Sequence, residues 1–232
     1  MITLENVTKT FGTGAIALSD INLKIDKGEF VFLIGPSGSG KTTFLRLLTR
    51  EMLPNAGSIV VNDVDLVKLP NNKVPELRRK IGVVFQDLKM LMDRTILENI
   101  SLPLEMVNMD QKDAQVRIDE ILEQVGIMDQ KDKFPIQLSG GELQRAAIAR
   151  ALVFSPEILL ADEPTGNLDP TTSWEIVKLL QDINKAGTTV VMATHNADIV
   201  NSLLKRTIAL EKGKIVKDTK KSTKAQAPKS NK

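Results

Sequence analysis

Residues 35–42 have the sequence Gly-Pro-Ser-Gly-Ser-Gly-Lys-Thr, and this stretch decides the fold. An apolar run at 30–34 precedes it, and apolar residues at helical spacing follow it at 44–48. A strand, a glycine-rich turn and a helix in this order are the context of a P-loop. The glycines let successive N–H groups converge on phosphate oxygens, and the helix adds its positive N-terminal end. The stretch therefore predicts a nucleoside triphosphate site, in which Lys41 reaches the β- and γ-phosphates and the Thr42 hydroxyl binds Mg²⁺.

Composition narrows the classes of protein that fit the chain. Its 232 residues, 42% of them hydrophobic, suffice for one sizeable domain. The absence of Cys excludes a disulfide frame, a thiolate metal site and a Cys nucleophile. Aromatic residues make up only 3%, which argues against a surface that stacks bases. The chain shows no basic-then-apolar leader and no apolar run near the roughly 18 residues of a membrane span, so we expect a soluble intracellular protein.

Charge is divided unevenly along the chain. Residues 212–232 hold eight Lys and one acidic residue, Asp218, whereas the preceding residues carry a net charge of −5. A mildly acidic body does not fit nucleic-acid binding. The basic tail has a composition that cannot bury a core, so we expect disorder there. Two roles stay open for this tail: it contacts an anionic membrane leaflet, or it is an inert, solvated end of the chain.

The remaining pattern predicts an α/β fold. Short apolar runs at 158–161 and 189–193 flank a helical pattern at 173–183, which is a βαβ arrangement with a largely parallel sheet. Further strands are expected at 2–7, 17–25, 58–61 and 81–85, and a terminal hairpin at 208–216. Between about 87 and 156 only helical patterns recur, so this segment is expected to be a helical insertion.

Two carboxylates end the apolar run Ile-Leu-Leu-Ala-Asp-Glu at 158–163. Ligands of α/β sheets bind at the carboxyl ends of strands, where Asp162 would hold Mg²⁺ and Glu163 would orient and polarise the attacking water. A solvated acidic strand end is the alternative, and the P-loop upstream disfavours it.

A second anion site is predicted at Leu138-Ser139-Gly140-Gly141-Glu142, where a helix begins. Ser139 can cap the helix, and the glycines expose N–H groups. One nucleotide cannot easily use this site and the P-loop at once. Taken alone, the stretch is better explained as a capped helix start.

In their order, these motifs resemble those of the ATP-binding cassette (ABC) ATPases, over roughly residues 1–217. The resemblance implies that Leu138 to Glu142 is the family signature, that Gln86 and the chain's single histidine, His195, join Glu163 in catalysis, and that Asp169 lies in the D-loop. It assigns Mg²⁺ to Thr42, Gln86 and Asp162. Phe11 would stack on adenine, where Tyr is more usual, and Glu142 replaces the usual signature Gln. The implied ATP-binding residues are Phe11, Gly35, Pro36, Ser37, Gly38, Ser39, Gly40, Lys41, Thr42 and Thr43.

The family resemblance also implies an architecture. We expect a P-loop NTPase fold with a RecA-like core of parallel sheet at about 1–86 and 157–217, an antiparallel β subdomain and a helical subdomain at about 87–156. Together these form one ABC domain over 1–217, with the basic tail at 218–232. In this family the signature of one subunit closes over ATP bound to another, so a homodimer is implied in the ATP-bound state.

The runs Thr-Thr-Ser-Trp-Glu-Ile at 171–176 and Met-Ala-Thr-His-Asn at 192–196 resemble the bacterial cell-division branch of the family. This implies a polytopic membrane protein as partner, peripheral association with the cytoplasmic face of the plasma membrane at the division site, and control of peptidoglycan hydrolysis outside the cell. The coupling surface would lie at about 86–100, where Leu88, Met90, Leu91 and Met92 form an adaptable apolar patch. Packing of these four inside the insertion is the alternative.

Other functions fit less well. An exporter or lipoprotein-releasing ATPase shares most of these motifs and stays open. A signalling GTPase or kinase is disfavoured by the signature and because Asn184-Lys185 is followed by Ala-Gly rather than by the guanine-reading pattern. Chromosome and DNA-repair cassettes contain long coiled coils or extra domains, which this chain lacks. A catalytically dead scaffold is disfavoured because the expected catalytic residues are all present.

Overall fold

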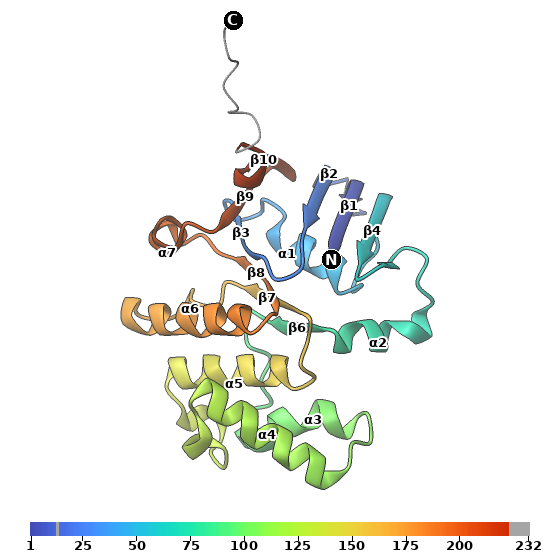
Figure 1. Cartoon of the computed structure of the whole chain (residues 1–232). Helices are drawn as coiled ribbons and strands as arrows, with labels where there is room; N and C mark the ends of the chain where they lie inside the picture. Colours follow the sequence, from blue (N-terminus) through green and yellow to red (C-terminus); the bar gives the residue numbers. More distant parts are fainter. Residues whose placement is uncertain (13, 223–232) are drawn as a thin grey trace, which may run out of the picture. The chain divides into compact units, whose positions relative to one another are not determined.

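The computed structural model describes residues 1–12 and 14–222, with the side chains of 221 and 222 left aside (Figure 1). It divides into two compact units. The P-loop unit comprises Met1–Asp26, Phe30–Pro70 and the described part of Met192–Lys232. The signature unit comprises Lys27–Glu29 and Asn71–Val191. Among the described residues, no helix has both the length and the apolar character that crossing a bilayer requires.

An antiparallel sheet of four strands forms one part of the P-loop unit, in the order β2-β1-β4-β5. Alternate residues of β1 are buried, and Leu4 pairs with Leu23 on one side and with Ile59 on the other. The alternation breaks at Asn6, whose positive φ of 50° accompanies a shift of register. The strands are β1 (Ile2–Thr10), β2 (Ile16–Ile25), β4 (Ala56–Val61) and β5 (Val64–Asp65).

The second part of the P-loop unit carries the glycine-rich loop. Strand β3 (Phe30–Ile34) is nearly all buried and runs parallel to β9 (Arg206–Glu211), with Leu33 opposite Ile208. Strand β9 pairs with β10 (Lys214–Asp218) in the predicted terminal hairpin. The helices of this unit are α1 (Lys41–Leu48), α7 (Ala197–Leu203) and α8 (Thr219–Ser222).

The sequence predicts a disordered tail from residue 218 onward, but the first residues of this tail are ordered in the structure. Asp218 is buried at the end of β10 and pairs with Arg206 at 2.9 Å, and the short helix α8 follows it. The rest of the predicted tail, 223–232, lies outside the described residues.

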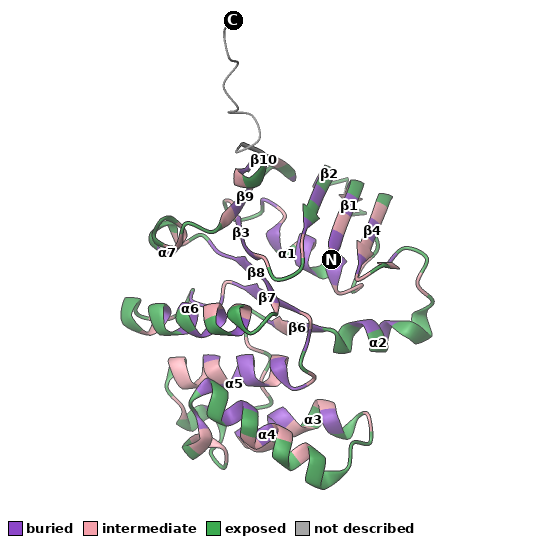
Figure 2. Cartoon of the chain, viewed as in Figure 1, coloured by how far each residue is buried: buried purple, intermediate pink, exposed green. Residues whose placement is uncertain are grey.

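Parallel strands and their connecting helix form the first part of the signature unit, which includes the last of these strands as far as Val191. Strand β6 (Ile81–Val84) runs parallel to β7 (Ile158–Asp162), and α6 (Pro170–Lys185) connects β7 to the neighbouring β8 (Thr189–Ala193). Every residue of β7 and β8 is buried, which Figure 2 shows in purple. This is the predicted βαβ arrangement, and its continuous apolar runs are typical of parallel strands. A short helix, α2 (Val74–Arg79), precedes β6 after the 3₁₀ turn η1 (Asn71–Lys73).

Three helices that pack against one another form the predicted helical insertion (Figure 1). Their buried faces are mainly aliphatic, with buried Asn99 in α3 and Gln144 in α5 as polar exceptions, and α5 contributes small residues, including Ala146 and Ala149, that allow close approach. Gly126 ends α4 in the left-handed conformation, as its position in the sequence predicts. The elements are α3 (Ile96–Glu105), α4 (Gln111–Val125), η2 (Met128–Gln130), η3 (Pro135–Gln137) and α5 (Gly140–Leu152).

Candidate functional site

The glycine-rich loop has the backbone geometry of a phosphate cradle. Gly35 and Gly40 have φ angles of 152° and 107°. A Cβ atom on Gly35 would lie 2.2 Å from the Leu210 carbonyl oxygen, and one on Gly40 would lie 2.5 Å from the Ala17 oxygen. Both positions therefore exclude any side chain, on grounds of backbone conformation and of space.

Three features around this loop suit an anion. Gly40 is the N-cap of α1 and supplies no side-chain cap, so the helix presents its N-terminal N–H groups without one. Lys41 folds back over the loop, and its Nζ donates to the carbonyl oxygens of Gly35 at 2.8 Å and Pro36 at 3.3 Å. The buried Ser39 hydroxyl has no hydrogen-bond partner among the described residues. Groups of these kinds suit a phosphate ligand.

Other predicted ATP contacts lie in the same unit. Thr42 is exposed and Thr43 half-buried on the first turn of α1, and Phe11 is exposed just after β1. His195 is exposed and follows the buried Thr194, whose N–H donates to the carbonyl oxygen of Leu33 at 3.1 Å. Because Leu33 is the next-to-last residue of the strand that leads into the P-loop, His195 leaves the sheet at the edge that carries residues 35–42.

The predicted catalytic carboxylates lie in the signature unit. Asp162 is the buried last residue of β7, and Glu163 follows it with a positive φ of 49°. Such a backbone conformation is unfavourable for glutamate and is often found at functional sites. Val84 of β6 pairs with Ala161 of β7, so the exposed Gln86 follows the neighbouring strand at the same sheet edge. The structure thus places Gln86, Asp162 and Glu163 together at the carboxyl ends of two parallel strands.

Signature residues Ser139 to Glu142, but not Leu138, line a cavity of about 290 Å³ in this unit, at which two helices begin. Ser139 caps α5 and Asp169 caps α6, so both positive helix ends are turned toward the cavity. A Cβ atom on Gly141 would lie 2.6 Å from Cγ2 of Thr172, which shows how closely the helix starts approach each other. The lining residues are Ser139, Gly140, Gly141, Glu142, Arg145, Asn167, Leu168, Asp169, Thr172 and Glu175.

Each cap is a charged hydrogen-bond pair. The Ser139 hydroxyl donates to Oε2 of Glu142 at 2.7 Å and accepts from the Glu142 N–H, while the Ser139 N–H also donates to that carboxylate. The Ser139 hydroxyl and then its backbone N–H lower the pKa of Glu142. Hydrogen bonds from the Thr172 hydroxyl and N–H lower the pKa of Asp169. Both carboxylates are therefore anionic at neutral pH and hold the first turns of their helices.

Residues 18–166 match the family model described as ABC transporter. The chain belongs to the ABC transporter family. This ABC protein is 49% identical to the cell division ATP-binding protein FtsE of Bacillus subtilis, over 94% of this chain and 96% of that one. It is 51% identical to FtsE of Mycobacterium tuberculosis, over 94% of this chain and 95% of the relative.

A solved structure gives the same assignment. The dimeric post-hydrolysis state of the ATP-binding cassette MJ0796 bound to ADP and Pi matches with a TM-score of 0.85 and 37% identity, over 94% of this chain and 97% of that one. The predicted ABC ATPase architecture is therefore confirmed: a parallel sheet, an antiparallel sheet and a helical insertion. As a member of this family the chain is a nucleotide-binding ATPase.

The structure of this ABC ATPase also identifies residues that the sequence motifs missed. Arg145 borders the signature cavity and donates to the carbonyl oxygen of Val125 and to Glu175, both at 2.9 Å, which joins α4, α5 and α6. Thr172 completes the Asp169 cap. The spacing Asp-x-x-Thr before a helix signals that cap, whereas nothing local in the sequence indicates the contacts of Arg145.

Proposed function

We propose that this chain is the FtsE-like ATPase subunit of a bacterial cell-division complex, in which ATP-driven dimer closure controls peptidoglycan hydrolysis outside the cell. The observation that carries the proposal is identity of 44–51% over at least 92% of the chain to proteins named cell division ATP-binding protein FtsE. The partner is a polytopic membrane protein of the FtsX type.

In the proposed ATPase reaction, residues 35–43 bind the triphosphate and Lys41 neutralises its developing charge. Glu163 orients the attacking water and accepts its proton, Gln86 contacts that water, and His195 contacts the γ-phosphate. Phe11 stacks on the adenine ring. Apart from Phe11, which follows a strand of the antiparallel sheet, these side chains follow parallel strands or begin the helix after one, which is where α/β folds position ligands.

Mg²⁺ fits the donor set that the family pattern assigns to it. The Thr42 hydroxyl, the Gln86 amide oxygen and the Asp162 carboxylate are hard oxygen ligands, which Mg²⁺ prefers together with phosphate oxygens and water. The ion would neutralise charge on the β- and γ-phosphates. We therefore propose that hydrolysis depends on Mg²⁺.

The proposed active form is a homodimer in the ATP-bound state. Residues Leu138 to Glu142 and Asp169 of one copy would complete the site of the other. Support comes from the signature cavity, to which two helix N-termini point, and from the similar MJ0796 cassette, whose post-hydrolysis state is a dimer bound to ADP and Pi. The γ-phosphate favours closure, and its loss reverses it.

The proposed membrane contact is the segment 86–100. Of its apolar residues, Leu91 and Met92 have 42% and 55% of their surface exposed, whereas Leu88 and Met90 are half-buried. The exposed Leu91 and Met92 could contact a partner protein, whereas the half-buried Leu88 and Met90 could pack inside the unit and support them. Such a contact would hold the ATPase peripherally on the cytoplasmic face of the plasma membrane, at the division site.

Purification of the tagged chain from detergent-solubilised membranes tests the proposal. We expect one polytopic division protein of the FtsX type to co-purify, and depletion of the chain to block cell separation. An exporter or lipoprotein-releasing complex is the competing assignment. Recovery of a transporter permease, with normal division after depletion, would establish that alternative instead.

A further inference from the structure

An unusual backbone lies between β6 and α3 in the signature unit. Leu88 and Lys89 are consecutive residues with φ angles of 56° and 51°, and neither is glycine. The left-handed conformation is unfavourable for residues with a Cβ atom, so two in succession require support from elsewhere. Only Met90 separates this pair from the exposed Leu91 and Met92.

Arg150 supplies that support from the last turn of α5. Its Nη1 donates to the carbonyl oxygen of Lys89 at 2.6 Å, and its Nη2 donates to that of Leu88 at 2.5 Å. A guanidinium presents its donors in a rigid planar fork, so one side chain holds both carbonyl groups in a defined orientation. Lysine has no equivalent geometry.

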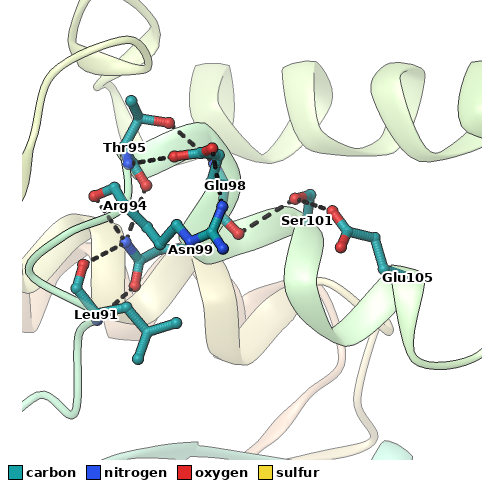
Figure 3. Close-up of polar contacts among 7 residues, drawn as sticks. All are labelled: Leu91, Arg94, Thr95, Glu98, Asn99, Ser101 and Glu105. Carbon is teal, nitrogen blue, oxygen red and sulfur yellow. Dashed lines mark hydrogen bonds and ion pairs between the residues drawn. The ribbon is translucent and has the colours of Figure 1, made fainter.

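Asn99 of α3 holds the segment from its other end, as Figure 3 shows. Asn99 is 1% exposed, and its Oδ1 accepts from the Leu91 N–H at 2.8 Å. Its Nδ2 donates to the carbonyl oxygens of Leu91, Arg94 and Thr95 at 2.9–3.2 Å. The Leu91–Met92 pair therefore stands on a loop that is fixed on both sides, by Arg150 and by Asn99.

Helix α5 connects this loop to the signature. Arg150 lies ten residues after Gly140, which corresponds to about 15 Å along the helix axis at the usual rise per residue. The intervening residues include buried alanines, and α5 packs against α3 and α4. We infer that such a close-packed helix responds to a displacement as one body. A displacement of the loop at one end of α5 then displaces the signature glycines at its other end.

We propose that Arg150 is a positioning residue that transmits partner binding at Leu91 and Met92 through α5 to the signature. This inference rests on the proposed function, because it takes the partner to be the membrane protein that contacts 86–100. Arg150 is not among the residues that line the signature cavity, and in this proposal it acts on the reaction through the placement of α5.

Arg117 provides a matched control in the same helical bundle. It donates to the carbonyl oxygens of Val153 at 3.1 Å and Leu152 at 3.0 Å, just beyond Arg150. Arg117→Ala thus removes two arginine–carbonyl hydrogen bonds from the end of α5 and leaves the loop contacts in place. A variant effect that is merely structural would appear in both substitutions.

The first experiment compares these variants in the complete complex with the membrane partner. For Arg150→Ala we expect basal hydrolysis and co-purification within about twofold of the wild type, but at least a fivefold loss of stimulation by the partner. Arg150→Lys should be intermediate, and Arg117→Ala should keep full stimulation. Equal losses in Arg150→Ala and Arg117→Ala, or no loss in either, would overturn the proposal. If Arg150→Ala does not fold, Arg150→Lys compared with Arg117→Lys decides by the same criterion.

A second experiment needs no partner, so its outcome is separate from that of the proposed function. The chain has no Cys, so Met92→Cys can be labelled alone with biotin maleimide and loaded with streptavidin. We expect the load to change basal kcat at least threefold when Arg150 is present and less than 1.5-fold in Arg150→Ala. The same response in both backgrounds, or none when Arg150 is present, would refute transmission through Arg150.

Discussion

A methyl group added at Gly141 tests the close packing of the two helix starts at the signature cavity. Gly141 has no unusual φ angle, so Gly141→Ala creates no backbone strain. The added Cβ would lie 2.6 Å from Cγ2 of Thr172, about 1 Å inside a normal carbon–carbon contact. Thr172 cannot turn away without loss of the hydrogen bond from its hydroxyl to Asp169, which measures 2.5 Å.

Two opposing terms set the expected change in the free energy of unfolding. Alanine in place of glycine in a helix is worth up to ~1 kcal/mol, and less in the first turn. Overpacking of this kind costs ~1–3 kcal/mol. We therefore expect Gly141→Ala to lower the free energy of unfolding by ~1 kcal/mol, or Tm by about 2–4 °C in a chain of this size.

Thr172→Ser identifies the cause of that loss. Serine lacks Cγ2 but keeps the hydroxyl that donates to Asp169, so it relieves the clash and retains the cap. The double variant should be more stable than the sum of the single effects predicts, with a coupling energy of ~1 kcal/mol or more. Urea denaturation of the full chain, with thermal melts as a second probe, measures all four members of the cycle.

Two results would contradict close packing at Gly141. If Gly141→Ala is as stable as the wild type, or if its effect simply adds to that of Thr172→Ser, the two helix starts do not pack as described. Gly12→Ala serves as the control, because a Cβ atom there meets nothing within 4 Å. This control should leave Tm within about 1 °C of the wild type, as expected for a surface substitution that creates no clash.

Three further predictions concern the chemistry and the membrane contact. Glu163→Gln should keep ATP binding and accumulate an ATP-bound dimer in gel filtration, with kcat at least ~10²-fold lower, as expected for loss of a general base; unchanged turnover would exclude this role. The lowered pKa of Glu142 means that its cap stabilises the fold above the ordinary Glu range near ~4.3 and loses this effect as pH falls through the lower folded value. The urea midpoints of wild type and Glu142→Gln should therefore differ at pH 7 and converge toward pH 3, and a constant gap would argue against the cap. Met92→Asp should reduce co-purification of the membrane partner at least tenfold with Tm within about 2 °C, because the side chain is more than half exposed; an unfolded variant would instead indicate a core position.

Most elements could be predicted from the sequence because their signals are local. The apolar run before residue 35, the glycines after it and the spaced leucines beyond them lie within about twenty residues of each other. Helix α3 lies in the predicted helical insertion, but its own bounds were not predicted, since Pro103 lies inside it and its first turn overlaps the expected coupling segment. A capping box, Thr95 with Glu98, marks its start and could have revealed it.

Contacts between distant positions could not be predicted in this way. Asp162, Glu163 and Gln86 were chosen by motif, and only the pairing of Val84 with Ala161 shows that their strands end side by side. The roles of Asn99 and Arg150 depend on which carbonyl groups they reach. Arg150 reaches carbonyl groups 61 and 62 residues earlier in the chain, a separation over which no sequence pattern extends.

By itself, the sequence determined that residues 35–42 form a glycine-rich turn between a strand and a helix, because the conformation of a turn depends on its own glycines and on the two elements that flank it. It likewise determined the family, through motifs that are each contiguous. Only the tertiary structure decided that two helix starts share one cavity at the signature, and that an arginine at the far end of α5 holds a strained loop. These features arise from packing between segments far apart in the chain, and packing is a property of the folded molecule rather than of any stretch of sequence.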